Sequence, residues 1–324
     1  MIEVRNLTKT FKVYKRNSGV KEALKSMVNR KYEVVEALKD VSFSIDHGEM
    51  IGYIGPNGAG KSTTIKIMSG ILNPDSGSCI VDGLVPWKDR VNHVKNIGVV
   101  FGQRSQLWWD VPVVDSFQLI KDIYELPESK FKSNLSELTK MLDIEDIIRM
   151  PARQLSLGQR MRCEITSSLL HNPKILFLDE PTIGLDAVSK IAVREFIKKI
   201  NKERGTTIIL TTHDTKDIEA LTERIILIGK GRVLLDGKLD TLKQKYGNIR
   251  TIFIEYDGVL KDLCEGLLIL EDKSGRASIK VDMNVMTIPE AITYLSYKVN
   301  IRDIEVSSAD MDDIVVAMYK EYSI

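Results

Sequence analysis

The sequence has 324 residues, a length that favours one large domain with a small second domain over two equal halves. With 46 Lys and Arg against 45 Asp and Glu, the net charge of +1 gives no reason to expect nucleic acid or an anionic surface as the main partner. The three cysteines, Cys79, Cys163 and Cys264, are far apart and lack metal-site spacing, so we expect free, buried thiols in a reducing cytoplasm.

Residues 2–54 show β-strand patterns. Ile2-Glu3-Val4 begins one strand, and residues 41–45 alternate apolar and polar side chains with the period of two that is typical of a half-buried strand. Residues 15–33 interrupt this layer as a basic, polar insertion. We interpret the insertion as a solvated loop with a short helix, in preference to a nucleic-acid or lipid patch.

The central part of the chain alternates strand and helix patterns. An apolar run at residues 50–54 leads into a glycine-rich loop, and residues 61–71 predict a helix that ends at Gly70. Further strands are expected at 78–81, 97–101, 175–178 and 207–211, with a helix at about 189–203 and a helical insertion over about 106–153. This alternation is typical of a parallel sheet covered on both faces.

The last block, residues 239–324, predicts a small α/β appendix. Strand patterns occur at 250–256, 277–281 and 299–306, and helical patterns at 288–297 and 311–322. We therefore expect a large domain over residues 1–238 and a small domain over residues 239–324. No apolar run approaches the roughly 18 residues of a spanning helix, so we expect that the chain does not cross a membrane by itself and that, if it serves a transporter, it docks on one.

Residues 55–62 read Gly-Pro-Asn-Gly-Ala-Gly-Lys-Ser and fit the phosphate-loop pattern G-x-x-x-x-G-K-[ST], between a strand and a helix. The glycines let backbone N–H groups curl around phosphate oxygens, Lys61 reaches the β- and γ-phosphates, and Ser62 offers its hydroxyl to Mg²⁺. The alternative, a chance glycine-rich turn, does not explain the full match in this context. By itself the phosphate-loop pattern does not identify one function, because it also occurs in kinases and GTPases.

A second half-site follows at residues 175–180, an apolar strand that ends in two adjacent carboxylates. Asp179 is suited to hold the water shell of Mg²⁺, and Glu180 to polarise an attacking water. An acidic strand end is common, so this feature gains its meaning from the motifs around it.

Those motifs stand in a characteristic order. Leu155-Ser156-Leu157-Gly158-Gln159 lies at a helix start shortly before the acidic strand, Gln103 follows the strand at 97–101, Gly184-Leu185-Asp186 follows Glu180, and His213 ends the strand at 207–211. Along the chain the order is Q-loop, signature motif, acidic strand end, D-loop and switch histidine, which is the order in ABC (ATP-binding cassette) ATPases, and the sequence resembles these over about residues 1–238. The resemblance implies a P-loop NTPase fold of the α/β class, with an antiparallel β subdomain and a helical subdomain at about residues 105–160.

The resemblance also assigns roles. Glu180, His213 and Gln103 would be catalytic: His213 would contact the γ-phosphate, and Gln103 would touch Mg²⁺ and sense a docked membrane subunit. Phe11, or less favourably Tyr14, would stack on adenine. ATP would be bound by Phe11, Gly55, Pro56, Asn57, Gly58, Ala59, Gly60, Lys61, Ser62, Thr63, Ser156, Gly158, Gln159 and Asp186, and Mg²⁺ by Ser62, Gln103 and Asp179. His47, His93 and His171 have no motif and are interpreted as core histidines with satisfied hydrogen bonds.

One position departs from the family pattern Leu-Ser-Gly-Gly-Gln, because Leu157 replaces its first glycine. In the family, the serine and the second glycine contact the γ-phosphate of ATP held by another subunit. Ser156 and Gly158 are retained, so a working composite site is expected. The resemblance thus implies that two copies of the chain form a head-to-tail dimer around ATP.

Several functions share these motifs. The insertion at 15–33, the segment 103–109 with Trp108 and Trp109, and the appendix resemble ATPases that pair with ABC-2 type permeases, usually for export at the cytoplasmic face of the cell membrane. Because adjacent residues on a helix do not both face inward, we expect at least one tryptophan to contact the permease. Soluble non-transport ABC ATPases are the alternative, but those of translation generally carry two cassettes, and those of DNA repair need a long coiled coil. A binding module without catalysis is disfavoured by Glu180 and His213.

Overall fold

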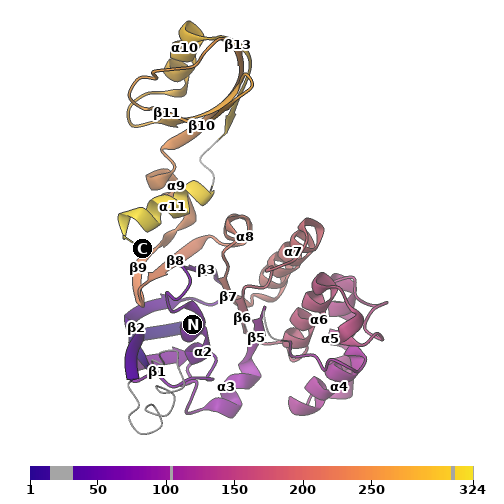
Figure 1. Cartoon of the computed structure of the whole chain (residues 1–324). Coiled ribbons are helices and arrows are strands. Elements are labelled where there is room, and N and C mark those ends of the chain that lie inside the picture. Colours follow the sequence, from indigo (N-terminus) through magenta and orange to yellow (C-terminus); the bar gives the residue numbers. More distant parts are fainter. Residues whose placement is uncertain (15–31, 103–104, 308–310, 324) are drawn as a thin grey trace, which may run out of the picture. The chain divides into compact units, whose positions relative to one another are not determined.

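The computed structural model describes residues 1–14, 32–102, 105–307 and 311–323. It divides the chain into two compact units, Met1–Asp236 and Gly237–Ile324, each with its own hydrophobic core (Figure 1). The basic insertion expected at 15–33 falls outside the described residues except for its last two positions. Gln103 and the side chain of Tyr14 also fall outside them.

An antiparallel layer begins the first unit. In it, β1 (Ile2–Tyr14) lies between β2 (Tyr32–Ile45) and β4 (Ser76–Val81). Both β1 and β2 extend well beyond the short strands predicted, because each finds a backbone partner along its outer half. There Phe11 pairs with Val35, although the Val35 side chain is exposed and gives no alternating pattern.

A six-stranded sheet forms the centre of this unit, with strand order β5-β6-β7-β3-β8-β9. Its strands are β3 (Met50–Ile54), β5 (Ile97–Phe101), β6 (Ile175–Asp179), β7 (Thr207–Thr211), β8 (Arg224–Gly229) and β9 (Arg232–Lys238). From β5 to β8 the pairs are parallel, as predicted. The carboxyl ends of β3, β6 and β7 therefore meet at one edge, where ligands bind in open α/β sheets.

The central sheet is covered on both faces. Alternate residues of β6 point to opposite sides, so Phe177 packs with the antiparallel layer and with α2 (Lys61–Met68), while Leu176 and Leu178 pack with the helices of the other face. Those helices include α4 (Val113–Ile123), α5 (Glu128–Met141), α6 (Leu157–Leu169) and α7 (Ala187–Arg204). Two of them, α4 and α5, lie within the predicted helical insertion, and they gather with α6 to one side of the sheet (Figure 1). Two short helices, α3 (Arg90–Asn96) and α8 (Thr215–Leu221), and a 3-10 turn, η1 (Ala152–Gln154), complete this unit.

Trp108 and Trp109 do not lie on a helix, so the helical argument made for them was wrong. They belong to a turn segment that precedes α4, and both are about half exposed, at 55% and 50%. The helical pattern predicted from about residue 106 therefore becomes a helix only at Val113, the first residue of α4. Pro112 stands immediately before α4, where the residue preceding a proline is biased away from helical conformation.

The second unit is a four-stranded antiparallel sheet with order β11-β12-β10-β13 and three helices. Its strands are β10 (Ile249–Asp257), β11 (Leu267–Lys273), β12 (Arg276–Asp282) and β13 (Asn300–Ser307), and its helices are α9 (Leu239–Tyr246), α10 (Ile288–Lys298) and α11 (Met311–Glu321). The sequence did not predict β11 or α9. In β11 the exposed Leu268 and Leu270 disturb the expected alternation, and the strand carries an irregularity between Ile269 and Glu271.

The isolated cysteines and histidines fall in varied surroundings. Cys79 and Cys163 are buried free thiols whose pKa burial raises to about 12, and Cys264 is half-buried. His93 and His171 are buried as predicted, but the prediction of satisfied hydrogen bonds is wrong for His93, because neither of its ring nitrogens has a hydrogen-bond partner among the described residues, and it holds only for Nε2 of His171, which contacts the Ile97 carbonyl oxygen at 2.9 Å. The prediction of a core position is wrong for His47, which is exposed and contacts the amino group of Met1. Within the described ranges of the chain, no helix combines the length and apolar character needed to span a bilayer.

Candidate nucleotide site

The phosphate loop, residues 55–60, joins the end of β3 to the start of α2. Gly60 precedes the helix with a φ of +112°, which residues with a side chain rarely adopt. A Cβ atom there would also lie 2.7 Å from the carbonyl oxygen of Ala37. Glycine is therefore required at this position, and the helix directs its unpaired N–H groups and partial positive charge at the carboxyl edge of the sheet.

Lys61 is buried at the first position of α2. Its ammonium donates hydrogen bonds to the carbonyl oxygens of Gly55 at 2.6 Å and Pro56 at 3.1 Å. Burial lowers the pKa of this ammonium, and the carboxylates of Glu180 and Asp179 oppose that shift. The positive charge is thus held between the loop and the acidic end of β6. Around it, Ala59 is buried, Thr63 is half-buried, and Asn57, Gly58 and Ser62 are exposed.

Two hydroxyl groups converge on Asp179 at the end of β6. Ser62 donates to its Oδ1 at 3.4 Å, and Thr211 of the neighbouring strand donates to the same atom at 2.5 Å. Hydroxyl and carboxylate oxygens are hard ligands of the kind Mg²⁺ prefers, and this ion commonly combines one or two carboxylates with phosphate oxygens and waters. The donor set therefore fits Mg²⁺.

The next residue, Glu180, contacts the predicted switch histidine. His213 Nε2 lies 2.9 Å from Glu180 Oε1 and 3.4 Å from Lys61 Nζ. Nε2 can donate to Glu180 when it carries the proton, or accept from Lys61 when the proton is on Nδ1. The fold thus brings together one side chain from the start of α2 and two from the segments that follow β6 and β7.

A cavity of about 330 Å³ opens at this edge, lined by Ser62, Lys66, Ile71, Phe101, Gly102, Asp179 and Glu180. Glu180 turns away from the strand with a φ of +56°, and its backbone N–H donates to the carbonyl oxygen of Thr211. The two carboxylates consequently stand side by side at the cavity. Phe11, predicted to stack on adenine, is a half-buried residue of β1 whose ring lies 5.7 Å from the ammonium of Lys9.

The predicted signature residues form the start of α6. Ser156 accepts a hydrogen bond from the Gln159 N–H at 3.2 Å, and the Gln159 side chain accepts from the Ser156 N–H at 2.9 Å, so the two residues cap the helix reciprocally. Asp186 caps α7 in a similar way through Ser189. Leu157, the departure from the family pattern, is half-buried and lies against Gly184 of its own chain. The leucine therefore leaves Ser156 exposed.

Comparisons with known proteins identify the family of the chain. The ABC transporter family profile matches residues 38–183. The ABC transporter ATP-binding protein NatA of Bacillus subtilis (strain 168) is 34% identical over 65% of this chain and 86% of its own length. The chain belongs to the ABC transporter family. It is an ATPase of this family, because its fold and motifs are those of the ATP-binding cassettes.

Other relatives of this ABC cassette differ in their stated roles. The linearmycin resistance ATP-binding protein LnrL of Bacillus subtilis (strain 168) is 31% identical over 72% of this chain and 74% of its own length. The methionine import ATP-binding protein MetN 2 of Enterococcus faecalis (strain ATCC 700802 / V583) is 33% identical over 74% and 70%. Among solved structures, a dimeric post-hydrolysis state of the cassette MJ0796 bound to ADP and Pi superposes with a TM-score of 0.61, at 29% identity over 74% of this chain and 99% of that one.

Gly158 of the ABC cassette offers a test of how tightly α6 packs on α7. A Cβ atom at Gly158 would lie 2.8 Å from Ser189 Cβ, so Gly158→Ala should force the two helix starts apart and lower the free energy of unfolding by about 1–3 kcal/mol. Gly237→Ala is the control, because its Cβ would meet only ordinary contacts at 3.8 Å, and we expect less than about 0.5 kcal/mol. Chemical denaturation measures both, and equal losses would contradict the close packing.

Sequence reasoning missed the polar residues behind the cassette's reactive groups. Thr211 binds Asp179, while Thr182, Arg194 and Asp217 form a buried cluster behind Glu180 and His213. The position of Thr211 at the end of a strand, directly before Thr212 and His213, was the one sequence feature that could have pointed to a role for this threonine at the site. Arg194 and Asp217 lie on two different helices, and their 23-residue separation carries no motif.

Proposed function

We propose that this ABC cassette hydrolyses ATP to drive export through a separate ABC-2 type permease, at the cytoplasmic face of the cell membrane. The observation that carries the chemical part is the position of His213 Nε2, which lies 2.9 Å from Glu180 Oε1 and 3.4 Å from Lys61 Nζ at the end of the phosphate loop. A positive charge, a carboxylate and an imidazole at this point match the needs of phosphoryl transfer to water.

The loop residues bind and orient the nucleotide in this proposal. The ammonium of Lys61 exchanges the carbonyl oxygens of Gly55 and Pro56 for oxygens of the β- and γ-phosphates, which are stronger acceptors because they are charged. Ser62 and Asp179, together with Gln103, hold Mg²⁺, which supplies positive charge to the phosphates. The backbone N–H groups of residues 58–63 complete the cradle.

Glu180 acts as the general base. Its carboxylate accepts a proton from the attacking water, and His213 fixes the carboxylate in place through the 2.9 Å contact between Nε2 and Oε1. Because the same nitrogen lies near Lys61, the imidazole also connects the base with the phosphate-binding lysine. His213 is therefore placed to report whether a γ-phosphate is bound.

The site is completed by a second copy of the chain. Ser156 is exposed at the N-terminus of α6, where it forms the capping pair with Gln159, whereas Gly158 is buried beside Ser189 of α7. A helix N-terminus favours an anion, so this one is suited to the γ-phosphate held by the other protomer. Support comes from the solved MJ0796 cassette, which is described as a dimer with ADP and Pi.

The permease is proposed to dock beside the helical insertion. A cavity of about 240 Å³ lies there, with Ile71, Arg90, Ile120 and Tyr124 among its lining residues, and the exposed Trp108 belongs to the segment just before α4. Behind the tryptophans, the buried carboxylate of Glu164 on α6 accepts hydrogen bonds from the Ser105 hydroxyl and the Gln106 N–H. We therefore expect a displacement of the segment that contains Ser105 and Gln106 to shift α6, the helix capped by Ser156.

Trp108→Ala should release the chain from membranes without affecting its chemistry. Exposed tryptophans are frequent binding hot spots, so we expect the membrane-bound fraction in the chain's own host to fall at least about tenfold. Tyr297→Ala, which removes an 88% exposed aromatic ring from α10, is the control and should leave the fraction unchanged. Quantitative blotting of sedimented membranes measures both. Retention of the Trp108 variant at the wild-type level would contradict this docking surface.

The partner and the direction of transport are tested in the same host. Purification through a tag on the chain should recover a multi-helix membrane protein, and recovery with ribosomes or DNA instead would favour a soluble non-transport ATPase. Export is supported by the resemblance to ABC-2 partners and by the resistance role in the name of LnrL, whereas the name of MetN 2 denotes import. In cells whose only copy of the chain carries Glu180→Gln, we expect the exported compound to accumulate inside the cell. A lower internal concentration than in wild-type cells would indicate import.

A further inference from the structure

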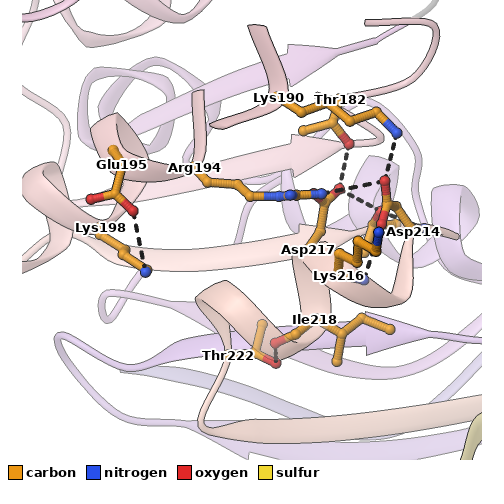
Figure 2. Close-up of polar contacts among 11 residues, drawn as sticks. Thr182, Lys190, Arg194, Glu195, Lys198, Asp214, Lys216, Asp217, Ile218 and Thr222 are labelled. Carbon is orange, nitrogen blue, oxygen red and sulfur yellow. Dashed lines mark hydrogen bonds and ion pairs between the residues drawn. The ribbon is translucent and has the colours of Figure 1, made fainter. Parts of the chain in front are cut away.

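Asp217 is a buried carboxylate that binds both loops of the reactive centre. It lies on α8 with no exposed surface, and its oxygens accept hydrogen bonds from Arg194 Nε at 2.6 Å, from the Thr212 hydroxyl at 2.9 Å and from the Thr182 hydroxyl. Figure 2 shows the Arg194 side chain reaching from α7 towards the carboxylates of Asp217 and Asp214. A charged group so deeply buried requires this set of partners, since an unpaired one would be strongly destabilising.

The two threonines connect this carboxylate to the reactive groups. Thr182 stands two residues after Glu180, and Thr212 stands immediately before His213. Both hydroxyls bind the same oxygen, Asp217 Oδ2, so the loop that carries the base and the loop that carries the histidine share one anchor. The contact between Glu180 and His213 then depends on a residue that touches neither of them.

A second carboxylate extends the anchor to α7. Asp214 is bound by Lys190 Nζ at 2.6 Å and lies 3.3 Å from Arg194 Nη2. Burial raises the pKa of Asp214, but Lys190 and Arg194 outweigh that effect and keep the pKa below its ordinary value, so Asp214 is ionised at neutral pH. Lys190 and Arg194 thus join α7 to Asp214, the residue after His213, by two ion pairs, and Arg194 joins α7 to Asp217 of α8 by a third.

We propose that Asp217 is a positioning residue for ATP hydrolysis, which sets the alignment of Glu180 with His213 through the hydroxyls of Thr182 and Thr212. The inference rests on the roles proposed above for Glu180 and His213. Both reactive side chains sit at loop ends, so a displaced anchor leaves nucleotide binding at the phosphate loop intact but misaligns the water, the base and the phosphate. Misplacement by about 1 Å from a remote change can lower a rate about 10²-fold.

Thr182→Val tests the proposal, because valine keeps the shape of threonine and removes only the hydroxyl. We expect kcat for ATP hydrolysis to fall about 10- to 100-fold while KM for ATP stays within about twofold, and Thr182→Ser, which keeps the hydroxyl, to restore kcat. Thr222→Val is the matched control. It removes a buried hydroxyl from the C-terminal end of α8, the helix that carries Asp217, where the Thr222 hydroxyl donates to the Ile218 carbonyl oxygen at 2.8 Å (Figure 2).

Steady-state kinetics and thermal unfolding of all three variants separate positioning from stability. The proposal is overturned if Thr182→Val keeps wild-type kcat, or if Thr222→Val lowers kcat by as much at an equal loss of stability. Should Thr182→Val fail to fold, Thr212→Val removes the other hydroxyl and is judged by the same criteria. An error in the assignment of Glu180 as the base would show itself differently from an error in the role of Asp217. Glu180→Gln would then remain active, whatever the activity of the threonine variants.

Discussion

Glu180→Gln should lower kcat for ATP hydrolysis by about 10²- to 10⁴-fold, the range that general-base catalysis typically contributes. Glutamine preserves the length and shape of the side chain, and its Oε1 can still accept from His213 Nε2 at the observed 2.9 Å. An amide, however, does not take a proton from water at neutral pH. The loss should therefore fall on the chemical step, while Lys61 and the phosphate loop bind ATP as before.

The measurement combines phosphate release with equilibrium ATP binding. We expect the dissociation constant of the variant to stay near the wild-type value, and gel filtration with ATP to show a trapped dimer. Glu195→Gln is the control, because Glu195 is an exposed residue of α7 that contacts Lys198 of the same helix at 3.4 Å, and its substitution should have no effect on turnover. Turnover by Glu180→Gln within tenfold of the wild-type rate would remove Glu180 from the role of base.

Local chemistry made the core of the site predictable. The phosphate loop needs glycine where the backbone takes a positive φ and approaches Ala37, and this need is visible as a short pattern. Residues 175–178 of β6 are all apolar because they are buried on both faces of the sheet, so the acidic end of the strand could be placed at the edge of the sheet in advance. Lys61, Asp179, Glu180 and His213 were accordingly all predicted, and the fold gathers them.

Contacts between segments that are far apart in the sequence could not be predicted from local patterns. Asp217 and Arg194 carry ordinary helical surroundings in the sequence, and only the packing of α8 on α7 makes them a buried pair. The outer half of β1 is a strand because β2 pairs with it, although its side chains have no clear period. Trp108 was placed on a helix because apolar spacing alone does not register the break at Pro112.

Two inactive variants should restore each other when mixed, if nucleotide lies between two protomers. Lys61→Met removes the phosphate-binding charge from one half-site. Ser156→Asp keeps the cap of α6, because aspartate is a good N-cap residue, but presents a negative charge to the γ-phosphate of the partner protomer. Each variant alone should lose at least about 10²-fold in kcat, since every site in its dimer is defective.

In an equal mixture, half of the dimers contain one chain of each kind, and each such dimer has one site with Lys61 and Ser156 both intact. If the two sites turn over independently, the mixture should recover about a quarter of the wild-type rate. Lys61→Met mixed with Glu180→Gln provides the control, because both residues belong to the same half-site and every mixed dimer keeps two damaged sites. Recovery in the control, or none in the first mixture, would contradict the head-to-tail arrangement, since a site built within one chain cannot be repaired by a partner.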